Sequence, residues 1–355
     1  MKRFFALLAV GLALASACAA QPAPAPAPVE IRVVVITTWE AVREGRDVRG
    51  ELSAWRAKWP LTRELPFPAG VHPLLFDPQR HVLAIVTGMA SARAAASVMA
   101  LGLDPRFELS RAYWVLAGTA GVDPAIASAG SVAWERYVVE GDIAQEVDAR
   151  DIPAGWPTGM VPDLRTTPYA QPPPPAANPF GTMAYHLDPR LVDWAYGLTR
   201  GVALGDDATL ARARALYSGP GAAPPFVLEG DGLMSARFWS GPHMTDWARR
   251  WVPYWTGGKG VFAMSAEEDA GVMQALTQLS GAGRVRLDRV LMLRGASDYV
   301  VGPPGESAAD QIARQAKEGL PANAEALDGL YAVASPVVRY LAEHWATTRE
   351  TAPGR

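Results

Sequence analysis

The sequence predicts an α/β domain of three layers, in which helices cover both faces of a central sheet. Apolar runs rich in β-branched residues, typical of strands buried on both faces, occur at residues 30–36, 81–86 and 112–117. The second run leads through a Gly-containing turn into the Ala-rich segment 90–101, whose composition favours a helix. Alternating strands and helices predict a layered α/β fold with ligands at the carboxyl ends of the strands.

The N-terminus has the pattern of a secretory signal peptide over residues 1–17. Lys2 and Arg3 precede a short apolar run that ends in small residues. This run is shorter than the roughly 20 residues that span a bilayer, and we expect no membrane span beyond it. Cys18 follows in a pattern that resembles a lipobox, so acylation of Cys18 and simple cleavage are both open. We therefore expect an exported protein, periplasmic or anchored in a membrane as a lipoprotein.

One folded domain is expected after the signal peptide. Residues 18–29 are rich in Pro and Ala and predict a stiff spacer. Residues 30–350 then form the domain. Its middle, at about 155–258, is rich in Pro, Gly and Trp, and we interpret it as an elaboration of the site or of an interface.

Composition excludes several classes of function. The formal net charge is −3 and the Lys and Arg residues are scattered, which argues against a nucleic-acid partner. The five His residues show no metal-ligand spacing, and a single cysteine allows no internal disulfide. The motifs of serine hydrolases, zinc proteases, nucleotide-binding loops and dinucleotide-binding folds are missing from the sequence. We expect a small ligand, no metal and no cofactor.

The ends of the predicted strands carry the candidate site residues. Asp298 is the most informative of them, because it places a carboxylate after the apolar-rich run 285–293. Turns after the other strands add further polar or Gly-containing groups: Thr87, Gly88 and Met89; Gly118 and Thr119; Glu267, Glu268 and Asp269. Together these strand ends predict one site.

Taken in this order, the segments resemble the nucleoside phosphorylase superfamily. Four stretches are, more narrowly, similar to the purine nucleoside permease family, a branch with that fold: residues 117–124, 137–143, 148–153 and 268–269. The resemblance covers residues 31–340. It implies a mixed central sheet, a purine nucleoside as partner, and cleavage of the N-glycosidic bond. It also implies a homo-oligomer as one arrangement, since superfamily members often share residues across subunits.

The resemblance implies a role for each acidic strand end. Asp298, in the Ser297-Asp298 motif, would protonate the purine at N7, which requires a raised pKa. Its alternative is a helix N-cap. Glu268 would accept hydrogen bonds from the ribose hydroxyls, and Asp269 beside it is a further candidate for binding the substrate, although acids here also suit the first turn of a helix.

Further residues would complete a nucleoside site. Phe238 or Trp239 would stack on the base. Residues of two turns would line the sugar or an anion beside it: Thr87, Gly88, Met89, Gly118 and Thr119. The glycines among them could equally be required by tight turns.

The nucleophile is where the sequence departs from the phosphorylases. No arginine precedes Gly118, and the first strand end lacks the Gly-Asp-Pro phosphate loop. Arginines further along could replace them: Arg43, Arg46 and Arg49. Glu40 or Glu44 could instead activate water. Phosphorolysis with inorganic phosphate as co-substrate, hydrolysis, and a non-catalytic nucleoside-binding protein that assists uptake therefore all remain open.

Overall fold

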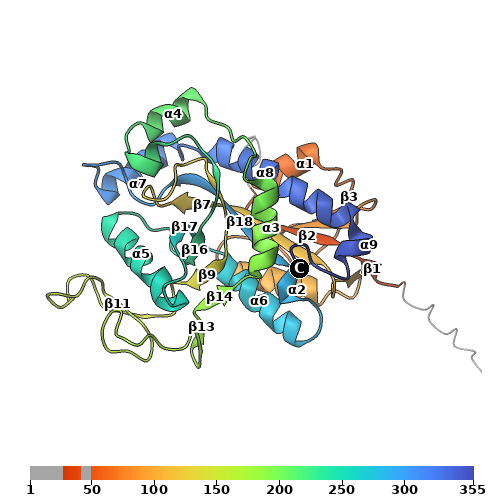
Figure 1. The fold of residues 1–355 in the computed structure, drawn as a ribbon, viewed down its shortest axis with the longest axis horizontal. Helices are drawn as coiled ribbons and strands as arrows, with labels where there is room; N and C mark the ends of the chain where they lie inside the picture. Colours follow the sequence, from red (N-terminus) through yellow and green to blue (C-terminus); the bar gives the residue numbers. More distant parts are fainter. Residues whose placement is uncertain (1–26, 41–48) are drawn as a thin grey trace, which may run out of the picture.

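The computed structural model describes residues 27–40 and 49–355 (Figure 1). The predicted signal peptide, Cys18 and most of the Pro/Ala-rich spacer lie outside the described residues. So do Arg43, Glu44 and Arg46 of the sequence predictions.

A mixed sheet of twelve strands forms the centre of the molecule. β2 lies between β5 and β7 and is parallel to both, whereas β17 runs antiparallel to β7. This mixed sheet confirms the predicted fold class. The strands, in spatial order, are β14 (Ala184–His186), β9 (Tyr137–Glu140), β16 (Asp231–Met234), β17 (Phe262–Ala266), β7 (Tyr113–Val122), β2 (Val33–Thr37), β5 (Val82–Val86), β4 (Leu74–Asp77) and β3 (Arg63–Leu65), with β18 (Val290–Tyr299), β8 (Val132–Trp134) and β15 (Val227–Glu229) branching from β7.

Helices pack against this sheet and bury their apolar faces in its core. The long helix α8 contacts β18, β7 and β2, and α3 packs on α8 (Figure 1). α2 and α6 pack against each other, and both add buried apolar residues to the same core. The helices are α1 (Ser53–Lys58), α2 (Ser91–Gly102), α3 (Pro189–Thr199), α4 (Ala208–Arg214), α5 (Pro242–Thr256), α6 (Asp269–Gly281), α7 (Ala308–Glu318), α8 (Asn323–Glu343) and α9 (Trp345–Thr348). None of the helices in the described ranges combines the length and apolarity needed to cross a membrane.

Short strands and turns complete the described chain. They lie outside the large sheet and pair locally: β1 (Val29–Glu30) with β6 (Phe107–Glu108), β10 (Gln145–Glu146) with β11 (Met160–Val161), and β12 (Ala177–Asn178) with β13 (Gly181–Thr182).

Two of the predicted strand ends lie inside longer strands. β7 continues through the glycines that were interpreted as a turn and ends at Val122, because β18 pairs with it along its whole length. β18 begins at Val290 rather than at residue 285, and it includes Asp298. The site residues of these two strands are therefore held by backbone pairing rather than by turns.

The segment at 155–258 is more than an elaboration of the site or of an interface, because it also supplies strands of the large sheet. Three of its strands, β14, β15 and β16, belong to the large sheet. Its helix α5 starts with Pro242 and is followed by Gly257, which has a φ of 64°, and both are typical positions for these residues. The tryptophans spaced by four on this helix are buried in a second apolar cluster, as a packed helix face requires: Trp247, Trp251 and Trp255.

Candidate active site

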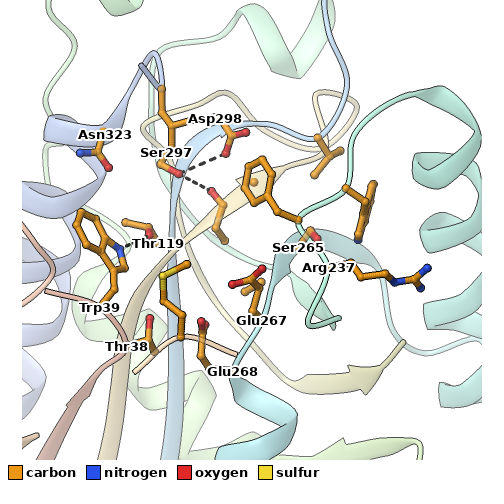
Figure 2. A pocket seen from close by; sticks show the side chains of 18 residues that line it. Thr38, Trp39, Thr119, Arg237, Ser265, Glu267, Glu268, Ser297, Asp298 and Asn323 are labelled. Carbon is orange, nitrogen blue, oxygen red and sulfur yellow. Dashed lines mark hydrogen bonds between the residues drawn. The ribbon is translucent and has the colours of Figure 1, made fainter. Parts of the chain in front are cut away.

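A cavity of about 280 Å³ opens where the carboxyl ends of β7, β17 and β18 meet (Figure 2). β7 and β17 approach from opposite directions and pair through their last residues, which brings both ends to the same place. Further residues come from the segments after β2, β5 and β16. The lining residues are Thr38, Trp39, Met89, Thr119, Ala120, Gly121, Arg237, Phe238, Trp239, Ser265, Ala266, Glu267, Glu268, Ser297, Asp298, Val300, Leu320 and Asn323.

Asp298 lies in the wall of this cavity and is only 2% exposed. Burial raises the pKa of its carboxyl to about 7. The pairing of β18 with β7 shifts register between Ala296 and Asp298, which is the mark of a bulge. Neighbouring strand residues normally point to opposite faces, and this bulge accounts for Ser297 and Asp298 both lining the cavity.

Glu268 lies across the cavity from Asp298 and is also buried (Figure 2). It directly precedes α6. Its Oε1 accepts a hydrogen bond from the backbone N–H of Ala90 at 3.1 Å, and its Oε2 accepts one from Nη2 of Arg294 at 2.8 Å. The carboxylate is therefore held in place from two sides while it remains part of the lining.

Arg294 is fully buried behind the cavity and holds together the acids that follow β17. Its Nε and Nη2 donate to both carboxylate oxygens of Asp269, at 2.9 and 2.5 Å. Its Nη1 donates to the backbone oxygen of Thr119 at 2.8 Å. A Cβ atom at Gly118 would lie 2.4 Å from Nη1, so only glycine leaves room for the guanidinium. Asp269 and Gly118 thus support Arg294 and are not among the lining residues.

Glu51 brings a further buried carboxylate to the same place. Its Oε2 accepts hydrogen bonds from the backbone N–H and the hydroxyl of Thr38, at 2.5 and 3.0 Å, and from the N–H of Trp39 at 3.3 Å. Its Oε1 accepts from the N–H and hydroxyl of Thr119, at 2.7 and 3.1 Å. Burial raises the pKa of Glu51. The backbone donors directly after β2 and at Thr119 in β7 are therefore occupied by a carboxylate of the protein itself.

A loop after β16 covers the side of the cavity with aromatic residues. Both carboxylate oxygens of Asp142 hold this loop: one accepts from the hydroxyl of Ser235 and the other from the N–H of Ala236, each at 2.6 Å. Phe238 is 62% exposed at the cavity. Trp239 lines it as well, and its ring lies 6.1 Å from that of Phe262. Exposed and half-buried rings of this kind can stack on a planar base.

The sequence model of the purine nucleoside permease (NUP) family matches residues 30–353. This chain belongs to the purine nucleoside permease family. The predicted family is thereby confirmed. Two curated proteins are similar to it. A "Probable purine nucleoside permease" of Schizosaccharomyces pombe is 29% identical over 278 residues, which are 75% of this chain and 77% of that protein. The purine nucleoside permease of Candida albicans is 27% identical over 270 residues, 74% of this chain and 64% of that protein.

Solved structures show which fold this permease-family chain has. The 5′-methylthioadenosine/S-adenosylhomocysteine nucleosidase of Helicobacter pylori superimposes with a TM-score of 0.52 at 12% identity, over 87% of this chain and 98% of that one. The enzyme of the same name from Neisseria meningitidis gives a TM-score of 0.50 at 15% identity, over 86% and 99%. Identities this low establish the fold alone, and they support the nucleoside phosphorylase-like fold predicted from the sequence.

The structure brings together more than half of the predicted site residues of this permease-family chain. Those that line the cavity are Asp298, Ser297, Glu267, Glu268, Met89, Thr119, Phe238 and Trp239. Thr87 and Gly88 lie beside it instead. The Thr87 hydroxyl donates to the backbone oxygens of Thr37, at the end of β2, and of Gly88, and Gly88 has a φ of 85°, which favours glycine.

Glu40 was predicted to activate water, but its hydrogen bonds hold the start of α1 instead. Its carboxylate accepts hydrogen bonds from the N–H of Leu52 at 3.0 Å and the hydroxyl of Ser53 at 3.2 Å, at the start of α1. It is not among the lining residues. Arg49 pairs with Asp328 at 2.7 Å on the surface, so its contacts do not favour phosphate binding either.

Among the site residues that were not predicted to bind or react, Glu51 carries no signal that the sequence alone could reveal. Glu51 lies in a polar stretch without a motif, and only the fold brings it to the strand ends. Arg294 could be noticed in the sequence, because it lies only four residues before Asp298. Glu267 was visible as one of three acids, and burial raises its pKa to about 7, with the charge of Glu268 adding to the shift.

More than one buried acid surrounds the single guanidinium of Arg294. Glu51, Glu268, Asp269 and Glu135 all lie around Arg294. Neither carboxyl oxygen of Glu135 has a hydrogen-bond partner among the described residues, and burial followed by the charge of Asp269 raises its pKa well above the usual range. We therefore expect Glu135 to be neutral, because an unpaired buried charge would cost too much free energy.

Proposed function

We propose that this protein hydrolyses the N-glycosidic bond of a purine nucleoside, with Asp298 as the acid to the leaving base. The observation that carries the proposal is that one cavity holds two kinds of carboxyl. Asp298 is a buried acid with a pKa of about 7, and Glu268 is a carboxylate held in place by Arg294. Departure of a base requires a proton donor, and the sugar requires acceptors for its hydroxyls.

The position of Glu51 favours water over phosphate as the nucleophile. Phosphate would need the backbone N–H groups of Thr38, Trp39 and Thr119, and these already donate to Glu51. It would also meet the repulsion of that carboxylate. Thr38 lines the cavity and its hydroxyl donates to Glu51, so it can accept a hydrogen bond from a water and pass a proton inwards.

The proposed hydrolysis breaks one bond at the sugar C1′ and forms another there. The bond between the sugar C1′ and the purine N9 breaks, and its electron pair goes to the base. Asp298 transfers its proton to N7, so the base leaves neutral. The water oxygen bonds to C1′, one water proton passes to the Thr38 hydroxyl, and the hydroxyl proton of Thr38 passes to Glu51. Free ribose and purine base are the products, and solvent later restores both carboxyls.

The test is to incubate the protein with inosine or adenosine, with and without inorganic phosphate, and to measure free base and sugar by chromatography. We expect base and free ribose without phosphate, and no acceleration when phosphate is added. Release that depends on phosphate and yields ribose 1-phosphate would overturn hydrolysis. Asp298→Asn should lower the rate by about 100-fold or more while nucleoside binding is retained; an unchanged rate would remove Asp298 from the acid role.

Binding without chemistry is the second candidate function. It is favoured by the names of the similar proteins, which are permeases. A protein that only binds a nucleoside could deliver it to a transport pathway. Tight nucleoside binding with no release of base in the same assay would support this function and contradict hydrolysis.

We also propose that the protein is exported, because its first residues have the pattern of a signal peptide. Mass spectrometry of the mature N-terminus tests this directly. Acylation of Cys18 would add the mass of the lipid, and Cys18→Ser would remove it. A chain that retains residues 1–17 in the cell would contradict export.

A further inference from the structure

A second cavity, of about 640 Å³, lies next to the candidate active site. Its lining comes from the segment 146–160, from Tyr169 and from α5. Its volume falls within the range of roughly 300–1,000 Å³ that is typical of small-molecule sites. None of the residues to which the proposed reaction assigns a step lines it.

The two cavities share a wall made of two contacts. Arg237 lines the first cavity and Glu146 lines the second, and Nη1 of Arg237 donates to Oε2 of Glu146 at 3.1 Å. Trp239 lines the first cavity and Trp247 the second, and their rings lie 6.0 Å apart. The second cavity is therefore a direct neighbour of the first.

The second cavity repeats the chemistry of the first. The first combines an exposed ring, Phe238, with the carboxyls of Asp298 and Glu267. The second combines the rings of Trp156 and Tyr169 with carboxylates and a guanidinium, those of Glu146, Asp246 and Arg250. Rings offer stacking surfaces for a planar ligand, and carboxylates accept hydrogen bonds from its N–H groups.

We propose that this second cavity binds a second purine, recognised by stacking on Trp156 and by hydrogen bonds to the carboxylate of Asp246. The choice of ligand class rests on the proposed function of the first cavity, whose chemistry the second repeats. A free base released in the first cavity would find this site on the other side of a single wall of side chains. The shared wall also couples the two sites, because a ligand that moves Glu146 or Trp247 moves the residues that line the first cavity.

The experiment counts bound purines by equilibrium dialysis with hypoxanthine or adenine, which are free bases and cannot be cleaved. We expect two equivalents per chain for the unaltered protein. Trp156→Ala should abolish one of them or weaken it at least tenfold, and Phe238→Ala, an exposed residue of the first cavity, should do the same to the other. Asp246→Asn, on the helix surface, gives a second variant of the second cavity should Trp156→Ala fail to fold.

The outcomes separate this inference from the proposed function. One equivalent or none in the unaltered protein overturns the second site, as do two unaltered equivalents in both Trp156→Ala and Asp246→Asn. Nucleoside cleavage with only one base bound overturns this inference alone. Two bases bound without any cleavage overturns hydrolysis alone and leaves the second site in place.

Discussion

Gln315 donates a hydrogen bond from Nε2 to Oδ2 of Asp298, at 2.9 Å. The two residues come from different elements, because Gln315 is on α7 and Asp298 is in β18. Burial raises the pKa of Asp298 to about 7, while the hydrogen bond from Gln315 lowers it. The hydroxyl of Ser297, which donates to Oδ1 at 3.3 Å, and the charge of Arg314 also lower this pKa, so the acidity of the carboxyl is a balance between desolvation and these groups, of which Gln315 contributes most.

Gln315→Leu should raise the pKa of Asp298, because it removes a donor that favours the ionised form. A hydrogen bond to a charged group is worth about 1.5–3 kcal/mol, which corresponds to about one to two pKa units. Asp298 acts as an acid only when protonated, so the decline of the rate with rising pH should move to higher pH by that amount. The measurement is the pH dependence of kcat/KM for base release.

The control for this prediction is Gln311→Leu, one turn earlier on the same helix. Gln311 is buried, whereas Gln315 is half-buried, and Gln311 donates to the backbone oxygen of Tyr299 at 2.7 Å, not to Asp298. This variant should lose stability without moving the pH profile. If both variants shift the profile equally, or neither does, Gln315 does not set the pKa of the acid.

Asp298 should also make the protein less stable as pH rises. Its folded pKa of about 7 lies above the ordinary value of 3.8, so the folded state holds its proton more tightly than the unfolded state does. The resulting stability is fully present below about pH 4 and is lost as pH rises through 7. A shift of about three units corresponds to on the order of 4 kcal/mol.

Asp298→Asn should remove this dependence, because an amide does not titrate. Urea unfolding at pH 5 and pH 8 measures it: the unaltered protein should lose more stability between these pH values than the variant. Equal losses in the two proteins would show that the carboxyl is not protonated in the folded state.

The strand ends could be predicted because local patterns mark them. Apolar runs identified β2, β5, β7 and part of β18, and the acid of β18 stood out because carboxylates are rare beside such runs. Segments that pair with distant strands were predicted less well. The glycines after residue 117 suggest a turn by composition, but β18 supplies a partner strand and Arg294 needs the space.

The residues that surround the predicted acids could not be found in the same way. Glu51 meets Thr119, 68 positions away in the sequence, and Gln315 belongs to a surface-patterned helix. Such contacts exist only once the chain is folded. Glu40 makes the same point: it is close to the first strand end in sequence, yet its carboxylate accepts hydrogen bonds from Leu52 and Ser53, and Glu51 is the acid that meets Thr38.

Thr38→Val should slow hydrolysis, whereas Thr38→Ser should not. The Thr38 hydroxyl donates to Glu51 at 3.0 Å and faces the cavity, so valine breaks the proposed path from water to carboxylate while serine keeps it. We expect kcat to fall by about 100-fold for valine, a typical loss when proton transfer is removed, and by only a few-fold for serine. Steady-state kinetics on both variants is the measurement. Similar rates for the two would exclude Thr38 from the path.

Gly118→Ala should disturb the site from behind, because its new methyl group would lie 2.4 Å from Nη1 of Arg294. Overpacking of this kind costs about 1–3 kcal/mol, and a displaced Arg294 would release Glu268 from its 2.8 Å hydrogen bond. We expect a lower free energy of unfolding and a raised KM for nucleoside.

The matched control is Gly197→Ala, in α3, where a Cβ meets nothing within 4 Å and alanine should stabilise the helix by about 0.5–1 kcal/mol. Because the two substitutions add the same atom, a Gly118→Ala protein as stable and as active as the Gly197→Ala protein would show that Arg294 can move without cost.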